Sequence, residues 1–337
     1  MKSLPFDLHG LVLIVLGLII SAVPPLHAET YFIGHLNPDT DSIVAAISAA
    51  AYYQGIPART GKMNKESQYL LKKTHYSAPM LIEDFSNKDV AAVDFNQRTQ
   101  APPKFQEGNL VEIIDHHALG VAPLTVDHPI AITIRPWGST STIIADMFIQ
   151  NRKPIDAPLA TLLLGGILAD TLEFRSPTTT IRDHEVATYL QTTAGIDDVH
   201  GFAMELFTAK SDVEDLTAAA ILTTDIKVFT INNRRLGFGV AETLSAETIL
   251  ARRDQILKEM ANYKQYEHLD LLYFCVIDML HLNSTMLLVG NEEKALAEKT
   301  FKSEIADGIM FLPGIVSRKE QFIPMLTKAS EESDRKE

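Results

Sequence analysis

Apolar and polar positions alternate along the chain in blocks, and the blocks predict strands and helices in turn. From residue 29 to about 205, short apolar runs of strand length are separated by segments with helical patterning. The predicted strands cover residues 31–33, 78–82, 89–93, 111–114 and 130–134, and the predicted helices cover 43–53, 143–150 and 158–169. Such alternation is typical of a mostly parallel sheet with helices on both faces. The sequence therefore predicts an α/β first domain at residues 29–207.

A polar stretch at residues 208–215 interrupts this pattern and predicts a linker. A second set of alternating elements follows it. Its predicted strands cover 224–231, 236–241, 271–277 and 286–289, and its predicted helices cover 245–263 and 292–305. These elements indicate a second, smaller α/β domain at residues 216–327. The charged tail, 328–337, is predicted to be disordered.

The first 28 residues have the pattern of an export signal. A 13-residue apolar run, 11–23, is shorter than the roughly 20 residues that span a bilayer, and Pro24-Pro25-Leu26-His27-Ala28 follows it. This order predicts a signal peptide at residues 1–28 that is cleaved after Ala28, and hence a periplasmic or secreted protein. A retained membrane anchor and a cytoplasmic protein are the alternatives.

Composition narrows the possible partners of the chain. Its 337 residues are 46% hydrophobic, enough for a sizeable core, and the formal net charge is −13. Such a charge disfavours nucleic-acid binding, which needs clustered Lys and Arg. If the signal is cleaved, no stable membrane partner is expected either. Cys275 is the only cysteine and lies in an apolar run, which excludes an internal disulfide and a thiolate metal cluster.

Acidic and imidazole side chains follow four of the apolar runs in the first domain. They are His35, Asp39, Asp41, Asp94, Asp115, His116, His117 and Asp170. The carboxyl ends of parallel strands meet at one edge of a sheet, where ligands bind in open α/β folds. One such residue is usually a solvated turn or helix cap, but four groups together predict a metal site.

The types of side chain indicate which metals fit. Imidazoles and carboxylates without thiolates suit Mn²⁺, Co²⁺ or Zn²⁺ better than Ca²⁺. Six ligands are too many for one metal with an open position. They suit two metals about 3.5–4 Å apart, bridged by a carboxylate and a hydroxide, which is an arrangement used on phosphate substrates.

A basic pair lies near the other end of the chain, within residues 314–321 (GIVSRKEQ). Arg318 can hold a phosphate with its planar fork, and Lys319 can hold one as a point charge. A solvated basic turn is the alternative. If the second domain folds over the metals, these two residues would close the site on an anion.

The motifs resemble the DHH phosphoesterase superfamily and, within it, the family II, manganese-dependent inorganic pyrophosphatases. The resemblance covers nearly everything after the signal segment. It is carried by residues 34–42 (GHLNPDTDS), 93–94 (VD), 114–117 (IDHH), 169–171 (ADT), 174–178 (FRSPT) and 317–319 (SRK). It implies hydrolysis of pyrophosphate to two phosphates at a dinuclear centre, with a bridging hydroxide as the nucleophile. It also implies two Mn²⁺ per subunit (Co²⁺ possible), Mg²⁺ arriving with substrate, a DHHA2-like second domain that closes over the active site, and a homodimer through the first domain.

The resemblance also assigns roles by position. The metal ligands it implies are His35 and Asp39 for one ion, Asp41, His116 and Asp170 for the other, and Asp94 as the bridge. His117 would contact substrate and protonate the leaving phosphate, with Asp115 holding an imidazole. Arg318 and Lys319 would bind the phosphates.

The chain departs from the family pattern at three positions. Phe95 replaces a common His after the bridging Asp, and Glu320 replaces a common Lys. The family's linker lysine falls on Thr208, two positions before Lys210, which leaves Lys210 as a candidate substrate contact. No long insert separates Asp94 from Asp115, so regulatory nucleotide-binding domains are not expected there.

Two other readings remain open at this point. One is a related DHH enzyme acting on polyphosphate, oligonucleotides or cyclic dinucleotides; the SRK motif and a single Trp, Trp137, disfavour it. The other is an exported metal- or phosphate-binding protein without turnover.

Overall fold

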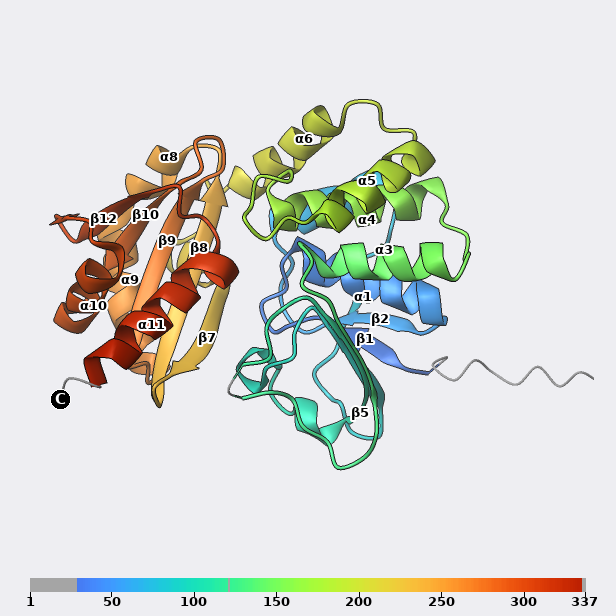
Figure 1. Cartoon of the computed structure of the whole chain (residues 1–337), viewed down its shortest axis with the longest axis horizontal. Coiled ribbons are helices and arrows are strands. Elements are labelled where there is room, and N and C mark those ends of the chain that lie inside the picture. The colour runs from blue at the N-terminus through green and yellow to red at the C-terminus, as the bar shows by residue number, and fades with distance from the viewer. Residues whose placement is uncertain (1–28, 121, 335–337) are drawn as a thin grey trace, which may run out of the picture.

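The computed structural model describes residues 29–120 and 122–334, which form two α/β domains side by side (Figure 1). The predicted signal segment, 1–28, lies outside the described residues. In the first domain six parallel strands pair in the order β3-β2-β1-β4-β5-β6. They are β1 (Tyr31–Ile33), β2 (Ile56–Arg59), β3 (Met80–Leu81), β4 (Asp89–Val93), β5 (Asn109–Asp115) and β6 (Ala131–Ile134).

Helices cover one face of this sheet, and irregular segments cover the other. The helices are α1 (Thr40–Tyr53), α2 (Lys65–Thr74), α3 (Thr140–Gln150), α4 (Ala157–Thr171), α5 (Ile181–Ala194) and α6 (Val199–Ser211). Successive strand residues point to opposite faces, so Phe32 packs in the helical core, whereas Ile33 packs with Phe95 and Phe105. The expectation of helices on both faces is therefore wrong. The β4–β5 and β5–β6 connections are loops, of which the first carries the short 3-10 turns η1 (Arg98–Gln100) and η2 (Phe105–Glu107).

Helix α4 forms the centre of the helical layer because it is apolar on nearly all sides. It contacts α1, α2, α3, α5 and α6, as a helix without a polar face should when it is buried on all sides. Glycine permits the closest of these contacts: a Cβ on Gly166 would lie 2.3 Å from Oγ of Ser141. This packing fixes the end of α4, which carries Asp170.

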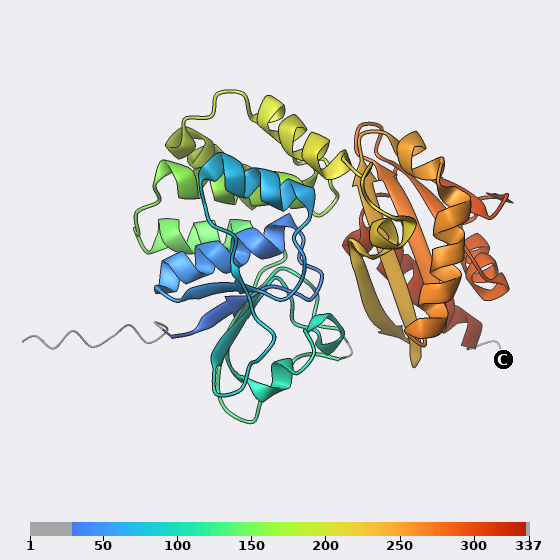
Figure 2. The same cartoon turned by 180° about the vertical axis from the view of Figure 1, so that it is seen from behind.

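The second domain contains a mixed sheet with the order β11-β12-β10-β9-β8-β7. Its strands are β7 (Ile226–Ile231), β8 (Arg234–Thr243), β9 (Leu271–Asp278), β10 (Asn283–Leu288), β11 (Ile305–Ala306) and β12 (Ile309–Pro313). Only β8 and β9 pair in parallel. Its helices are α7 (Ala218–Thr223), α8 (Ala246–Leu250), α9 (Arg253–Tyr266), α10 (Asn291–Phe301) and α11 (Ile323–Asp334), preceded by a π-helical turn, η3 (Arg318–Phe322). Figure 2 shows this domain from behind, and the predicted two-domain α/β class is confirmed.

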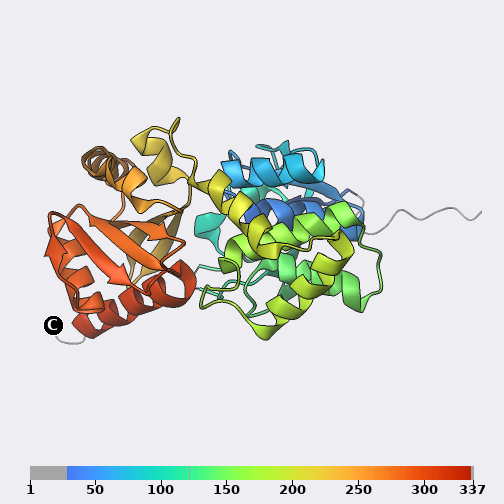
Figure 3. The ribbon, with the colours of Figure 1, turned by 90° about the horizontal axis from the view of Figure 1, so that it is seen from above.

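The boundaries differ from expectation at two places. Residues 208–211 complete α6, which leads into the second domain (Figure 3), so the irregular connection begins at Asp212. Residues 328–334 belong to α11, and the prediction of disorder is wrong for them. Leu326 and Ala329 are buried against the second domain, and this contact stabilises a helix that its charged sequence did not predict. No helix within the described residues is long and apolar enough to cross a membrane.

Candidate metal centre

The loop after β1 places the first metal-capable side chains. Asp39 caps α1, its Oδ1 accepting a hydrogen bond from the Ser42 backbone N–H at 2.9 Å. The backbone N–H of His35 donates to Ser42 Oγ at 3.1 Å. A Cβ on Gly34 would lie 1.9 Å from that Oγ, so only glycine allows the strand and helix to approach this closely. The result is that His35 Nε2 lies 3.2 Å from Asp39 Oδ2.

Asp94 lies at the end of β4, and each of its two carboxylate oxygens faces a different set of metal-capable side chains. Oδ2 lies 3.5 Å from His35 Nε2, and Oδ1 lies 3.4 Å from His116 Nε2. Its backbone is left-handed, with a φ of 64°, a conformation that Asp tolerates better than most residues. Thr140 Oγ1 also donates to Oδ1 at 3.0 Å. The carboxylate is therefore aimed at both groups at once.

The second set combines Asp41 of α1, His116 directly after β5, and Asp170 of α4. His116 Nε2 lies 3.4 Å from Asp170 Oδ2, and ligand atoms of Asp41, His116 and Asp170 lie within 4.8 Å of one another. The same limit holds for His35, Asp39 and Asp94. The six side chains predicted as metal ligands thus converge in two sets of three.

Hydrogen bonds outside the two sets orient their members. Asp41 accepts from Ser139 Oγ at 2.7 Å, from the backbone N–H groups of Thr140 and Ser141, and from Ser141 Oγ. His116 Nδ1 lies 3.0 Å from the Trp137 carbonyl and donates to it, which leaves Nε2 facing the acids, as in many metal-binding histidines. Sequence reasoning missed residues 137–141, although their position after β6 was a signal for the same sheet edge.

Asp115 fixes the orientation of His117. Its Oδ1 accepts from His117 Nδ1 at 2.8 Å, and its Oδ2 accepts from Asn96 Nδ2 at 2.6 Å. Because a carboxylate only accepts, Nδ1 carries the hydrogen and Nε2 is left without it when the ring is neutral. His117 lines the cavity between the domains, so the ring is positioned to meet a ligand there.

The electrostatics of the site are those of crowded, buried acids. Burial, with Asp94 and Asp170 as further causes, raises the pKa of Asp41, and burial raises the pKa of Asp170 to about 7. Burial raises the pKa of Asp94, but the neighbouring imidazoles of His116, His35 and His117 together outweigh it, so the net pKa is well below the usual range. Burial lowers the pKa of His117 to about 4. Shifts of this kind mark functional sites.

The residues fit a pair of transition-metal ions. Among the described residues, Oδ2 of Asp94 has no hydrogen-bond partner although it is buried. A buried carboxylate oxygen without a donor is costly, and a cation between Asp94, His35 and Asp39 would satisfy it. Imidazoles and carboxylates without thiolates are the donor set of Mn²⁺. His35, Asp39 and Asp94 can hold one ion, and Asp41, His116, Asp170 and Asp94 can hold the other.

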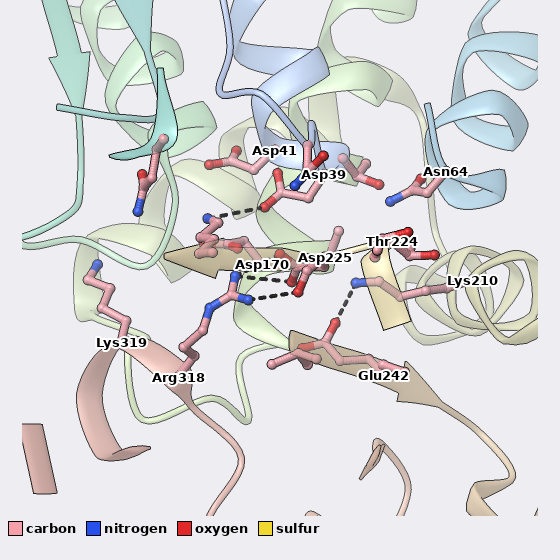
Figure 4. Close-up of a pocket in the computed structure, with 18 of the residues that line it drawn as sticks. Asp39, Asp41, Asn64, Asp170, Lys210, Thr224, Asp225, Glu242, Arg318 and Lys319 are labelled. Carbon is pink, nitrogen blue, oxygen red and sulfur yellow. Dashed lines mark hydrogen bonds and ion pairs between the residues drawn. The ribbon is translucent and has the colours of Figure 1, made fainter. Parts of the chain in front are cut away.

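A cavity of about 770 Å³ lies over these residues, and side chains of both domains line it (Figure 4). Lys319 Nζ is 3.4 Å from the Trp137 carbonyl, beside His116, and Arg318 lies in the same wall. Lys227 Nζ lies 3.8 Å from Asp39 Oδ2, and its side chain is 6% exposed. Sequence reasoning missed Lys227; its signal was a lone cation inside the predicted strand 224–231.

Lys210 lines the same cavity but is held by acids. Its ammonium pairs with Glu66 of α2 at 3.3 Å and with Glu242 of β8. Glu66 is buried and also accepts from Thr40 Oγ1 at 2.6 Å. Direct substrate contact by Lys210 stays a prediction; its contacts in the structure join the two domains instead.

Comparison with known proteins extends over both domains. The model of the DHH family N-terminal domain matches residues 29–167, and that of the DHHA2 domain matches residues 204–329. The manganese-dependent inorganic pyrophosphatase of Methanocaldococcus jannaschii is 37% identical over 307 residues, covering 89% of this chain and 98% of that protein. The protein of the same name from Bacillus subtilis is 32% identical over 306 residues, covering 89% and 98%.

Similarity of structure agrees with similarity of sequence. A crystal structure described as a family II inorganic pyrophosphatase of Methanococcus jannaschii superposes with a TM-score of 0.84 at 36% identity. The match covers 90% of this chain and 99% of the other.

Proposed function

The chain belongs to the manganese-dependent inorganic pyrophosphatases, and we propose that it hydrolyses pyrophosphate to two phosphates at a pair of metal ions. Family membership makes it an inorganic diphosphatase and confirms the resemblance in the sequence. The observation that supports the dinuclear centre is the orientation of Asp94, whose two oxygens face two different imidazoles at 3.5 and 3.4 Å.

The metals would be held by the residues that converge in the first domain. We assign one Mn²⁺ to His35 and Asp39 and the other to Asp41, His116 and Asp170, with Asp94 shared between them. When bound, such a pair supplies Lewis-acid stabilisation and a bridging hydroxide as the nucleophile at neutral pH.

The remaining side chains act on the charge of the substrate. Lys319, Arg318 and Lys227 project into the cavity from the second domain and neutralise charge on phosphate oxygens, which is the main requirement of phosphoryl transfer. Lys227 takes the substrate-binding role considered for Lys210, whose ammonium is already shared by two glutamates.

His117 would handle the proton of the leaving group. Burial keeps its pKa near 4 in the metal-free protein, so the ring is neutral at pH 7. A multiply charged anion in the cavity would raise that pKa, and Asp115 stabilises the imidazolium that forms. The ring can then transfer a proton to the leaving phosphate.

Phosphate release by the purified protein with Mn²⁺ tests this function. We expect pyrophosphate to be preferred over tripolyphosphate and over a cyclic or linear dinucleotide by at least about 100-fold in kcat/KM, or about 2.7 kcal/mol. A preference for tripolyphosphate or a dinucleotide would favour another DHH phosphoesterase. Metal binding without any phosphate release would favour the non-enzymatic binding protein.

Four other expectations belong to the same proposal. Co²⁺ would replace Mn²⁺, Mg²⁺ would enter with substrate, and the first domain would form a homodimer, for which the exposed Ile132 on edge strand β6 offers a surface. Residues 1–28 would direct export and be removed after Ala28. The N-terminal residue of the protein recovered from expressing cells tests the last point: Glu29 is expected, and Met1 would contradict it.

A further inference from the structure

We propose that Asp225 is a positioning residue for the reaction, because its carboxylate holds Arg318 in the cavity wall at a fixed place beside Lys227. The proposal deepens the function proposed above and rests on it. Asp225 lies directly before β7, whereas Arg318 begins the turn η3, 93 residues later in the chain. Figure 4 shows the two side chains facing each other.

Four hydrogen bonds fix the guanidinium of Arg318. Nη2 donates to both carboxylate oxygens of Asp225, at 2.8 and 3.1 Å. Nη1 donates to the backbone carbonyls of Asp225 and Phe238, at 3.0 and 3.3 Å. Only 12% of the arginine side chain is exposed. Pairs of charged groups with several donors in a fixed fork are the most strongly oriented side-chain contacts.

These contacts leave part of the guanidinium available for an anion. A guanidinium has five N–H groups, and among the described residues the four bonds above use only Nη1 and Nη2. The Nε hydrogen is not used by these four bonds, and Arg318 lines the cavity. Asp225 therefore fixes the orientation of the Arg318 guanidinium, which still lines the cavity.

The segment that carries Asp225 is itself tied to the metal loop. The carbonyl of the next residue, Ile226, accepts from Asn37 Nδ2 at 3.0 Å, and Asn37 lies between His35 and Asp39. One residue further, Lys227 Nζ lies 3.8 Å from Asp39 Oδ2. Residues 225–227 of the second domain thus place the positive side chains of Arg318 and Lys227 at fixed positions relative to the metal-binding loop of the first domain.

When the Asp225 carboxylate is removed, the change in charge and the change in geometry should affect pyrophosphate binding in opposite directions. Asp225 adds a negative charge to a cavity that binds an anion, so electrostatics alone would make Asp225→Asn bind pyrophosphate more tightly. An amide in its place keeps one accepting oxygen, but it puts an N–H donor where the other oxygen was and removes the negative charge. Arg318, which has only donors, then loses one partner and its ion pair, and its position is less tightly fixed. Misplacing a substrate-orienting group by about 1 Å can cost about 100-fold in rate.

The first experiment compares the Mn²⁺-loaded enzyme with Asp225→Asn. We expect kcat/KM for pyrophosphate to fall by at least about tenfold, with a higher KM contributing to the loss, although the cavity has become more positive. Asp307→Asn is the matched control, because Asp307 is an exposed turn residue of the same domain, and it should retain normal kinetics. A lower KM in Asp225→Asn, or unchanged kinetics, would overturn the proposal. If this variant does not fold, Asp225→Ser removes the carboxylate without adding an amide and carries the same expectation.

A double-mutant cycle with Arg318→Gln separates positioning from general damage to the structure. Once Arg318 is absent, Asp225→Asn should change kcat/KM by less than about twofold, because the group that it orients is gone. An equal loss in both backgrounds would show that Asp225 acts on the fold rather than through Arg318. Inactivity of the parent enzyme itself would refute the proposed function, whereas an active parent with an unaffected Asp225→Asn variant refutes only this inference.

Discussion

Replacing Asp94 with Asn is expected to abolish nearly all pyrophosphatase activity, with a loss in kcat of at least about 1,000-fold, or roughly 4 kcal/mol. The carboxylate has one oxygen toward His35 and one toward His116. An amide keeps one oxygen and places a nitrogen that cannot bind metal at the other position. Asp94→Ala, which removes both oxygens, should lose at least as much. Metal content measured by mass spectrometry should fall from two ions per chain to one or fewer, in parallel with activity.

The control makes the same chemical change where it should have no effect. Asp197→Asn alters an exposed residue in the loop between α5 and α6, and it should leave both metal content and kcat near those of the parent enzyme. An Asp94→Asn variant that retains two ions and more than a tenth of the parent activity would refute the bridging role.

The part of the site that the sequence predicted is the part built from local patterns. Apolar runs of strand length ending in Asp94 or in His116 are visible in the sequence, and the parallel sheet then brings those ends together at one edge. The same logic placed Asp170, because a helix packed along that sheet ends at the same edge. The position of each of these three side chains depends only on the strand or helix that carries it and on the element packed beside it.

What the sequence did not predict depends on contacts between distant elements. Lys227 reaches Asp39 across the domain interface, 188 positions away in the chain, and its strand pattern alone suggests an ordinary surface residue. The support of Asp41 by Ser139 and Ser141 requires α1 and α3 to be packed together. Helix α11 was missed for the same reason, since burial of Leu326, rather than helix propensity, holds it.

Removing the metals is expected to abolish activity and to lower the thermal stability of the protein. Without cations, four carboxylates meet in a buried site, where burial and, as a further cause, the neighbouring carboxylates raise the pKa values of Asp41 and Asp170. Each ion bound at about 100 times its dissociation constant adds about 2.7 kcal/mol of stability. Scanning calorimetry after treatment with EDTA should show Tm lowered by roughly 5–10 °C or more. Added Mn²⁺ should restore both Tm and turnover, and it should restore less in Asp94→Asn. An EDTA-treated enzyme that keeps its activity would contradict a metal-dependent mechanism.

Because the ligands are crowded and buried, metal ions and protons compete for them. The pKa values of the ligands determine whether metal affinity rises or falls with pH. Burial and Lys319 lower the pKa of His116, but Asp170 and Asp94 outweigh them and raise it to about 9, so its ring is protonated below that pH. Asp170 is protonated below about pH 7.

A ligand must lose its proton to bind metal, so the affinity for Mn²⁺ should rise with pH, by about tenfold per pH unit for each proton released. Between pH 7 and 9 Mn²⁺ should therefore displace at least one proton, and below pH 7 it should displace more. Calorimetric titration with Mn²⁺ in buffers of different ionisation enthalpy measures this number. Binding without proton release at pH 7.5 would contradict the prediction that a protonated His116 becomes a ligand, because an imidazolium must lose a proton before Nε2 can bind an ion.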